Sequence, residues 1–177
     1  MGKSTLNRNM LMNIIAIVLS IMACTISLYE ANIMNVQQKA MVWPHLQLQD
    51  NFNAAGYSVI ASNNGVGPCI IKSMEVTYNG LPIASYYTFL NQVDEKQSVG
   101  YDKIKVNKLN KTVLKNGEER LLFQIKIDSS TERIVSEFRK LNFKISYASV
   151  LDENWYLDKE KGEIHSTEFI ADLEFKN

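Results

Sequence analysis

Two histidines, His45 and His165, are the side chains best suited to bind a metal ion or to transfer a proton near neutral pH. Neither has a second histidine or a cysteine at the spacing that zinc sites use. Such a site takes three or four ligands, so we expect no metal site. We place both histidines on exposed surfaces.

Motifs for nucleophilic catalysis and phosphate binding are missing from the sequence, which has no nucleophile elbow, phosphate loop or paired metalloprotease histidines. Gly65-Val66-Gly67 matches part of a dinucleotide fingerprint but lacks the third glycine and the following helix, so we interpret it as a turn. Cys69 follows Pro68 at the start of an apolar run, which favours a small core residue over a reactive thiol.

Two adjacent acidic pairs, Glu118-Glu119 and Asp152-Glu153, are candidates for acid–base catalysis. Neighbouring residues of a strand point to opposite faces, and both pairs stand beside predicted turns, where acidic residues serve solubility. We therefore assign no catalytic, cofactor-binding or metal-binding residue and expect no cofactor. The binding residues are unknown at this stage, and we expect a protein that is not an enzyme.

Aromatic and charged residues could form binding surfaces. Trp43 and Trp155 could be ligand platforms, although buried aromatic residues are the commoner case. The better candidates for an exposed aromatic patch are Tyr86, Tyr87 and Phe89. Segment 102–111 holds four lysines, whereas 152–174 holds eight acidic residues and two lysines. Both segments can be solvated faces, and the basic one can also contact anionic headgroups or a partner.

The whole chain has 177 residues, of which 46% are hydrophobic and 21% charged, and its formal net charge is zero. A neutral chain does not fit a nucleic-acid binder that works by neutralising phosphates. Sparse glycine, proline and cysteine exclude collagen-like, disordered and disulfide-rich classes.

Residues 10–29 form a long uncharged apolar stretch. About 20 helical residues span roughly 30 Å, the thickness of a bilayer's hydrocarbon core, so we predict a transmembrane helix with the lipid bilayer as its partner. Two alternatives stay open. The stretch could be a cleaved secretory signal, or Cys24 could be lipidated within the weak lipoprotein box Ile21-Met22-Ala23-Cys24.

The basic residues that flank this stretch predict its orientation. Lys3 and Arg8 precede it and Lys39 follows, which favours a cytoplasmic amino terminus. Pro44 disfavours helix at Trp43 and predicts the end of the helical part. The predicted order is a cytoplasmic tail over 1–9, the transmembrane helix over 10–29, a helical stalk over 30–42 and an extracytoplasmic domain over 43–177.

Beyond Pro44 the hydrophobic period becomes two, as half-buried antiparallel strands require. One predicted core face carries Leu121, Phe123, Ile125 and Ile127, and another Phe169, Ala171, Leu173 and Phe175. In segment 69–78 the alternation of apolar residues is interrupted. A bulge around Lys72-Ser73 would place Ile71, Met74, Val76 and Tyr78 on the core face. Asn64-Gly65, Asn79-Gly80 and Asn116-Gly117 predict tight turns.

Two segments interrupt the strands. Ser130-Thr131 begins a predicted capped helix of about three turns, and Ala84–Val93 fits either a helix or a strand. The predicted fold is mainly β. An amino-terminal transmembrane helix and a short helical stalk precede an immunoglobulin-like antiparallel β-sandwich of seven to nine strands with one or two short helices.

Three segments resemble an uncharacterised bacterial family of membrane-anchored proteins. They are Trp43-Pro44-His45-Leu46, then Asn64-Gly65-Val66-Gly67-Pro68-Cys69-Ile70-Ile71, and Tyr147-Ala148-Ser149 followed by Trp155. The resemblance covers most of residues 10–160, with Cys69 where the family usually has alanine. It implies one amino-terminal membrane helix and a small β-sandwich, and it implies no activity.

We therefore expect a single-pass protein of the bacterial inner (cytoplasmic) membrane. Its domain would lie outside the cytoplasm, on the periplasmic side, and would bind or scaffold an unidentified envelope protein. Two alternatives stay open, namely an accessory subunit that acts through its transmembrane helix and an envelope enzyme with an unrecognised site. The sequence does not identify the partner, the pathway or the oligomeric state.

Overall fold

The computed structural model covers all 177 residues and describes them except 1–7, 55, 95–98, 130, 166–174 and 176–177. It divides the chain into two compact units, Met1–Met41 and Val42–Asn177. The second unit is called the domain below. The fold is mainly β, as predicted, with two antiparallel sheets, whereas the immunoglobulin-like arrangement stays a prediction.

The first unit contains the helix α1 (Arg8–Met41), which has 34 residues and no buried side chain. By length and composition α1 could span a membrane. A helix of 34 residues extends roughly 51 Å, which exceeds a hydrocarbon core of about 30 Å. Ser20 and Thr25 direct their hydroxyls to backbone oxygens of the same helix at 2.8 Å, so an apolar environment costs these two side chains little.

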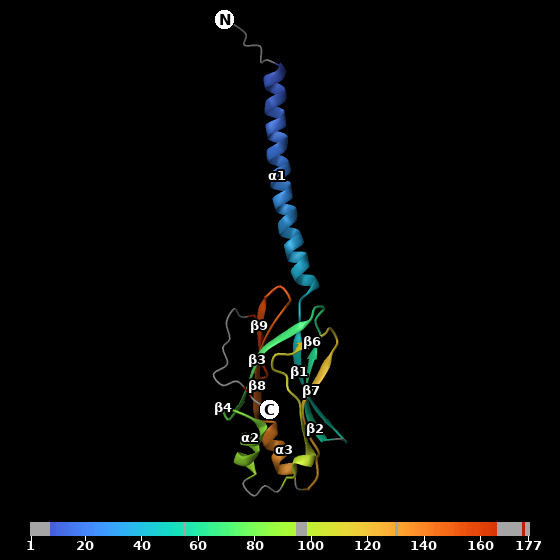
Figure 1. Cartoon of the computed structure of the whole chain (residues 1–177), viewed down its shortest axis with the longest axis vertical. Helices are drawn as coiled ribbons and strands as arrows, with labels where there is room; N and C mark the ends of the chain where they lie inside the picture. Colours follow the sequence, from blue (N-terminus) through green and yellow to red (C-terminus); the bar gives the residue numbers. More distant parts are fainter. Residues whose placement is uncertain (1–7, 55, 95–98, 130, 166–174, 176–177) are drawn as a thin grey trace. The chain divides into compact units, whose positions relative to one another are not determined.

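The first sheet has four antiparallel strands (Figure 1). Their spatial order is β1 (Leu46–Asn53), β2 (Gly56–Asn63), β7 (Glu119–Ile125) and β5 (Ile104–Val106). The β1–β2 pair is in register over all eight residues of each strand. The end of the domain at which β1 begins, called the Val42 end below, is where the chain enters from α1.

The second sheet lies beside the first as a separate layer (Figure 1). Its order is β10 (Gly162–His165), β9 (Asn154–Asp158), β8 (Leu141–Ala148), β3 (Cys69–Tyr78) and β4 (Leu81–Ile83), and β6 (Val113–Leu114) also pairs with β3. On the edge of β3 between β6 and β4, the backbone N–H of Phe175 donates to the Met74 oxygen at 3.0 Å. The other residues of the predicted face 169–175 lie outside the described part of the chain.

A bulge in β3 confirms the predicted break in its alternation. The register with β8 shifts between Ile71 and Ser73, so Ile71, Met74 and Val76 are all buried and Tyr78 packs against the core. A second bulge was not predicted. It lies in β7, where Ile60 pairs with Leu121 and Val59 with Phe123.

The β7 bulge changes which residues of that strand enter the core. Leu122 is completely buried and Leu121 is half-buried, so the predicted core position of Leu121 is wrong. Ile127, predicted on the same face, lies beyond the end of β7 and is 37% exposed. The extra residue shifts the alternation by one position, which a regular period of two cannot anticipate.

Three short helical segments complete the domain. Ala84–Val93 contains the helix α2 (Tyr86–Val93), whose first turn is capped by Ser85, because the Ser85 hydroxyl accepts from the Thr88 N–H at 3.2 Å. The helix α3 (Glu132–Phe138) is shorter than predicted. Its Thr131 donates its hydroxyl to the Lys126 oxygen at 2.7 Å and caps no N–H of α3. The one-turn helix η1 (Tyr101–Lys103) precedes β5.

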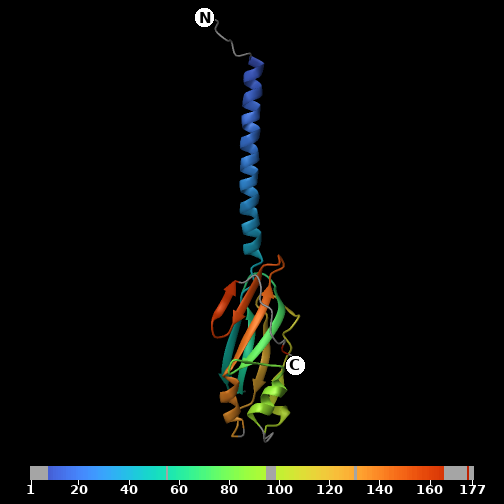
Figure 2. The ribbon, with the colours of Figure 1, turned by 90° about the vertical axis from the view of Figure 1, so that its left-hand side faces the viewer.

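The core lies between the two sheets and continues under α2 and α3, which lie together at the end of the domain away from β6 (Figure 2). Aromatic rings fill this part of the core. The Phe123 and Phe138 rings stack with 4.6 Å between centroids, and Tyr86 meets Phe175 edge to face at 4.7 Å. The Tyr86 ring also lies 5.5 Å from the Phe123 ring between centroids, so these contacts join β7, α3, α2 and Phe175 into one core.

Candidate functional site

The histidines occupy the ends of strands. His45 precedes β1 and is half-buried, with its ring 5.3 Å from the Trp43 ring between centroids. This contact corrects the prediction that His45 is exposed, and His165 is the last residue of β10. Within the described part of the chain, no group of three His, Cys, Asp or Glu side chains could hold a metal ion.

The predicted core residues are placed as expected in two cases. Cys69 is completely buried at the start of β3, as a small core residue would be. Trp155 is buried and stacks on Tyr147 with 5.9 Å between centroids. Trp43, in contrast, is 42% exposed, and Cys24 lies on the exposed surface of α1.

The predicted aromatic patch is wrong for two of its three members. Tyr86 and Phe89 are buried, and Tyr87 is exposed. Because this segment is a helix, residues three apart share a face, and the first and fourth positions turn together into the core.

The two predicted acidic pairs lie beside turns, and Glu119 is the first residue of β7. Glu118 accepts hydrogen bonds from the Lys115 backbone N–H at 3.0 Å and from Arg120 at 2.8 Å, and these bonds lower the pKa of Glu118. Asp152 lies between β8 and β9 with a φ of 55° and a side chain that is 91% exposed. A carboxylate with a lowered pKa is a weak base, so Glu118 is poorly suited to proton abstraction.

Asn63, the last residue of β2, holds the Val42 end of the domain together. Its side chain is completely buried and makes five hydrogen bonds to the backbone. The Nδ2 atom donates to the oxygens of Gly67, Leu114 and Lys115, and the Oδ1 atom accepts from the N–H groups of His45 and Gly65. One amide thereby joins the segment before β1 to the β2–β3 and β6–β7 connections.

The β2–β3 connection packs directly on the backbone with which the domain begins. The N–H groups of Val66 and Gly67 donate to the Trp43 oxygen at 2.9 and 3.1 Å. A Cβ atom on Gly67 would collide with the Val42 carbonyl group, and one on Gly65 with the backbone of Trp43 and His45. The predicted turn therefore needs glycine because two backbones approach closely. Segments 42–45 and 64–67, which are separated by β1 and β2 in the sequence, meet here.

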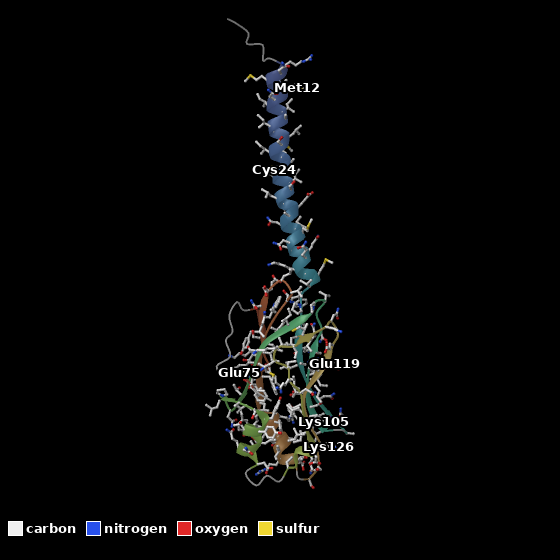
Figure 3. The ribbon with its side chains drawn as sticks, viewed as in Figure 1. Met12, Cys24, Glu75, Lys105, Glu119 and Lys126 are labelled. Carbon is white, nitrogen blue, oxygen red and sulfur yellow. The ribbon has the colours of Figure 1, made fainter. Side chains whose placement is uncertain are left out.

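The outward face of the second sheet carries a polar cluster of side chains, one of which is Glu75 (Figure 3). Glu75 is 3% exposed, and its Oε1 atom lies 3.1 Å from Lys144 Nζ on the neighbouring strand. Asn142 donates to Asp158 Oδ1 at 3.0 Å. A depression of about 480 Å³ lies over this cluster. Its lining includes Thr77, Asn79, Gly80, Lys140, Asn142, Lys144, Asp158, Glu160 and Lys161.

Asp158 has a structural role in this cluster. Burial alone raises the pKa of Asp158, but hydrogen bonds from Asn142 and from the backbone N–H groups of Glu160 and Lys161 outweigh it and lower the pKa. These bonds hold the β9–β10 turn, at 3.0 Å from the Glu160 N–H and 3.4 Å from the Lys161 N–H. An ionised, hydrogen-bonded carboxylate of this kind organises the surface and is a weak base.

The first sheet carries a lysine cluster, formed by Lys103, Lys105 and Lys126, on its outward side at the end opposite Val42. Figure 3 shows Lys105 and Lys126 close together on this layer. These three lysines, with Ala54, Asp102, Gln124 and Ile127, line a second depression of about 280 Å³. The sequence predicted a basic segment over 102–111, but not the contribution of Lys126, which directly follows β7. A sequence pattern could have predicted that Lys126 faces outward, because Gln124 and Lys126 alternate with the apolar residues Phe123 and Ile125.

The arrangement as a whole suits binding. Ammonium, carboxylate and amide groups stand in the lining of both depressions, and such groups recognise polar or charged ligands. No protein-family model, curated protein or solved structure matches this chain. The two polar surfaces of the domain and the α1 helix are therefore the features on which a function can be based.

Proposed function

We propose that this chain is a single-pass membrane protein whose domain is an immunoglobulin-like β-sandwich and a non-catalytic binding or scaffolding module outside the cytoplasm. One observation carries the proposal. A 34-residue helix without buried side chains carries the uncharged apolar stretch 10–29 and is joined to a domain that has its own core. About 20 consecutive exposed apolar side chains are stable in lipid and costly in water.

The flanking charges support the orientation. Lys3 and Arg8 precede the apolar stretch, whereas Lys39 lies near the carboxyl end of α1. Cytoplasmic loops carry an excess of lysine and arginine, so the amino terminus would lie in the cytoplasm of a bacterial cell and the domain beyond the inner membrane.

The electrostatics of the domain support a binding role over catalysis. A general base works best with a pKa near the operating pH. The pKa of each of Glu118, Glu137 and Asp158 is lowered by hydrogen bonds, which moves these carboxylates away from that range. They serve as hydrogen-bond acceptors that fix turns and side chains.

Cysteine labelling in intact bacteria tests the membrane topology. We would introduce Ser4→Cys or Asp152→Cys into a Cys24→Ser background and apply a membrane-impermeant maleimide. Asp152 is 91% exposed, so its cysteine should react in intact cells, whereas the cysteine at position 4 should react after lysis. The reverse pattern, or recovery of the domain free of the membrane, would overturn the proposal.

Crosslinking tests the binding role. A photoreactive residue at position 161, in the lining of the larger depression, should capture a defined envelope protein in growing cells. The matched control carries it at Gln49, an exposed position on the other sheet. Replacing residues 10–29 with an unrelated span should preserve the crosslink. Loss of the crosslink after this exchange would favour an accessory subunit that acts through its helix.

A further inference from the structure

The lysine cluster is built by the pairing of β5 with β7. Lys105 pairs with Gln124, and beyond the ends of the strands the Lys126 N–H donates to the Lys103 oxygen at 3.0 Å. Ile104 and Ile125, at the intervening paired position, face the core. Three lysines and one amide are thus brought to one small area of the outward surface by the backbone ladder itself.

The positive charges in this area are incompletely balanced. Lys103 Nζ lies 2.7 Å from Asp128 Oδ2, which neutralises that lysine. Lys105 and Lys126 are both exposed, and within the described part of the chain neither ammonium group forms a hydrogen bond or an ion pair. Because Lys105 pairs with Gln124, Lys126 is its diagonal neighbour across the ladder, a separation that two long side chains can span to contact one anion.

The space between these side chains suits a small hydrophilic group. The depression has a volume of about 280 Å³, and Gln124 contributes an amide that can donate to an oxygen. Asp102 is the acidic residue of the described lining, and its Oδ1 atom lies against Gly100. Lysine ammonium groups bind phosphate as point charges, and two of them match the two negative charges that a phosphate monoester approaches near neutral pH.

We propose that the lysine cluster is a binding site for the phosphate group of a soluble phosphate monoester, recognised by Lys105, Lys126 and Gln124. This inference rests on the proposed function, because it gives the binding module a ligand class. The site lies at the far end of β1 from Val42, and eight strand residues separate the two ends by about 27 Å. A lipid headgroup can carry the same phosphate monoester, and binding to vesicles distinguishes it from an ester in solution.

The test uses the full chain in zwitterionic nanodiscs at fixed ionic strength. Its amide and lysine NMR signals are followed while sn-glycerol 3-phosphate is added, with acetate as a singly charged comparison. We expect saturable shifts centred on Lys105, Gln124 and Lys126, and at least tenfold weaker binding of acetate. Absence of saturable shifts, or equal binding of acetate, would overturn the proposal.

Matched variants separate the site from general charge. Lys105→Gln with Lys126→Gln should weaken binding at least tenfold. Lys108→Gln with Lys115→Gln removes the same charge from exposed residues outside the described lining and should leave binding unchanged. Asp102→Asn should strengthen binding severalfold. Equal losses in the two double variants would show nonspecific attraction and refute a site.

Further outcomes identify the source of the ligand and separate this proposal from the proposed function. Binding to phosphatidic acid vesicles without binding of the soluble ester would overturn the soluble source. If phosphate binding fails while the topology and crosslinking results hold, the ligand class is wrong and the membrane-anchored binding module stands. If the topology result fails and phosphate binding persists, the site stands without that module.

Discussion

The Lys159 ammonium group lies 2.9 Å from Asp50 Oδ1 and joins the two sheets, since Asp50 belongs to β1 and Lys159 follows β9. The Lys159 side chain is 17% exposed, and its Nζ atom lies 5.6 Å from the centroid of the Phe143 ring. Burial and the nearby Asp50 carboxylate raise the pKa of the Tyr57 hydroxyl. Asp50 is 41% exposed, whereas the Lys159 ammonium group is shielded from water, so removing the Asp50 carboxylate would leave a shielded charge unpaired, which is costly.

Removing one member of this pair should destabilise the domain more than removing both. Asp50→Leu leaves the Lys159 charge unpaired and should lower the free energy of unfolding by about 1–3 kcal/mol. Adding Lys159→Leu should recover part of that loss. Urea unfolding of the full chain in micelles measures both, with Trp155 fluorescence as the signal.

The control for this pair is Lys72→Leu, because Lys72 lies 3.9 Å from an Asp152 side chain that is 91% exposed. It should change stability by less than about 0.5 kcal/mol. Strictly additive effects of the Asp50 and Lys159 changes would contradict the coupling.

Asn63 and Asn64 are adjacent residues with the same side chain and should differ sharply in their effect on stability. Asn63→Ala leaves three carbonyl oxygens and two N–H groups without their partner and should cost about 2–4 kcal/mol. Asn64→Ala removes one exposed hydrogen bond to Gln47 and should cost less than about 0.5 kcal/mol. Thermal unfolding by near-ultraviolet circular dichroism compares the two, and similar losses would sink the role given to Asn63.

Variants of Gly67 and Gly80 compare two reasons for which a position needs glycine, namely the close approach of another backbone and a positive φ. Gly67→Ala pushes a methyl group into the Val42 carbonyl and should cost about 3 kcal/mol. Gly80→Ala meets no neighbouring atom but must keep a φ of +80°, so about 1 kcal/mol is expected. The measurement is the urea midpoint of each variant at a constant m-value, and an equal shift for both would refute the close approach.

The Tyr78–Glu137 hydrogen bond, 2.6 Å between Oη and Oε2, should make stability depend on pH at both extremes. Hydrogen bonds from Lys140 and Tyr78 lower the pKa of Glu137, so its contribution is present above the ordinary value of 4.5 and is lost as acid protonates it. The same hydrogen bond raises the pKa of Tyr78. The stability that the neutral Tyr78 hydroxyl contributes is therefore present below pH 10.0 and is lost as the pH rises above it.

The check for this pair compares Glu137→Gln and Tyr78→Phe with the parent chain across pH. Each variant should be less stable than the parent at pH 7. The Glu137→Gln difference should vanish in strong acid, and the Tyr78→Phe difference in strong alkali. Glu132→Gln, on the same helix, is the control, and a stability loss in Glu137→Gln that is independent of pH would contradict the assignment.

Local sequence patterns predicted the elements and missed what depends on tertiary contacts. The period of Ile71, Met74 and Val76 predicted the β3 bulge, because a break in alternation is visible in the sequence. The β7 bulge was missed, since Leu121, Leu122 and Phe123 are all apolar and offer no break to detect. Ser85 predicts the start of α2 better than the ambiguous run that follows it.

In the candidate sites, too, local patterns were visible in the sequence and tertiary contacts were not. Four lysines in segment 102–111 were visible, but their link to Lys126 depends on the pairing of β5 with β7. In the sequence, nothing distinguishes Asn63 from other residues that precede a turn. Its five hydrogen bonds form because three loops meet after folding. Pairing between distant segments has no local signal, so these contacts could not be predicted.

The bonds around Trp43 have a mechanical consequence. A tension applied at Val42 along the β1 axis would first load the hydrogen bonds that the Trp43 oxygen accepts. It would next load the hydrogen bonds between the eight paired residues of β1 and β2, all at the same time. Loaded in shear, these bonds break together and not one after another. The domain should therefore resist traction through its amino terminus more strongly than traction through a loop.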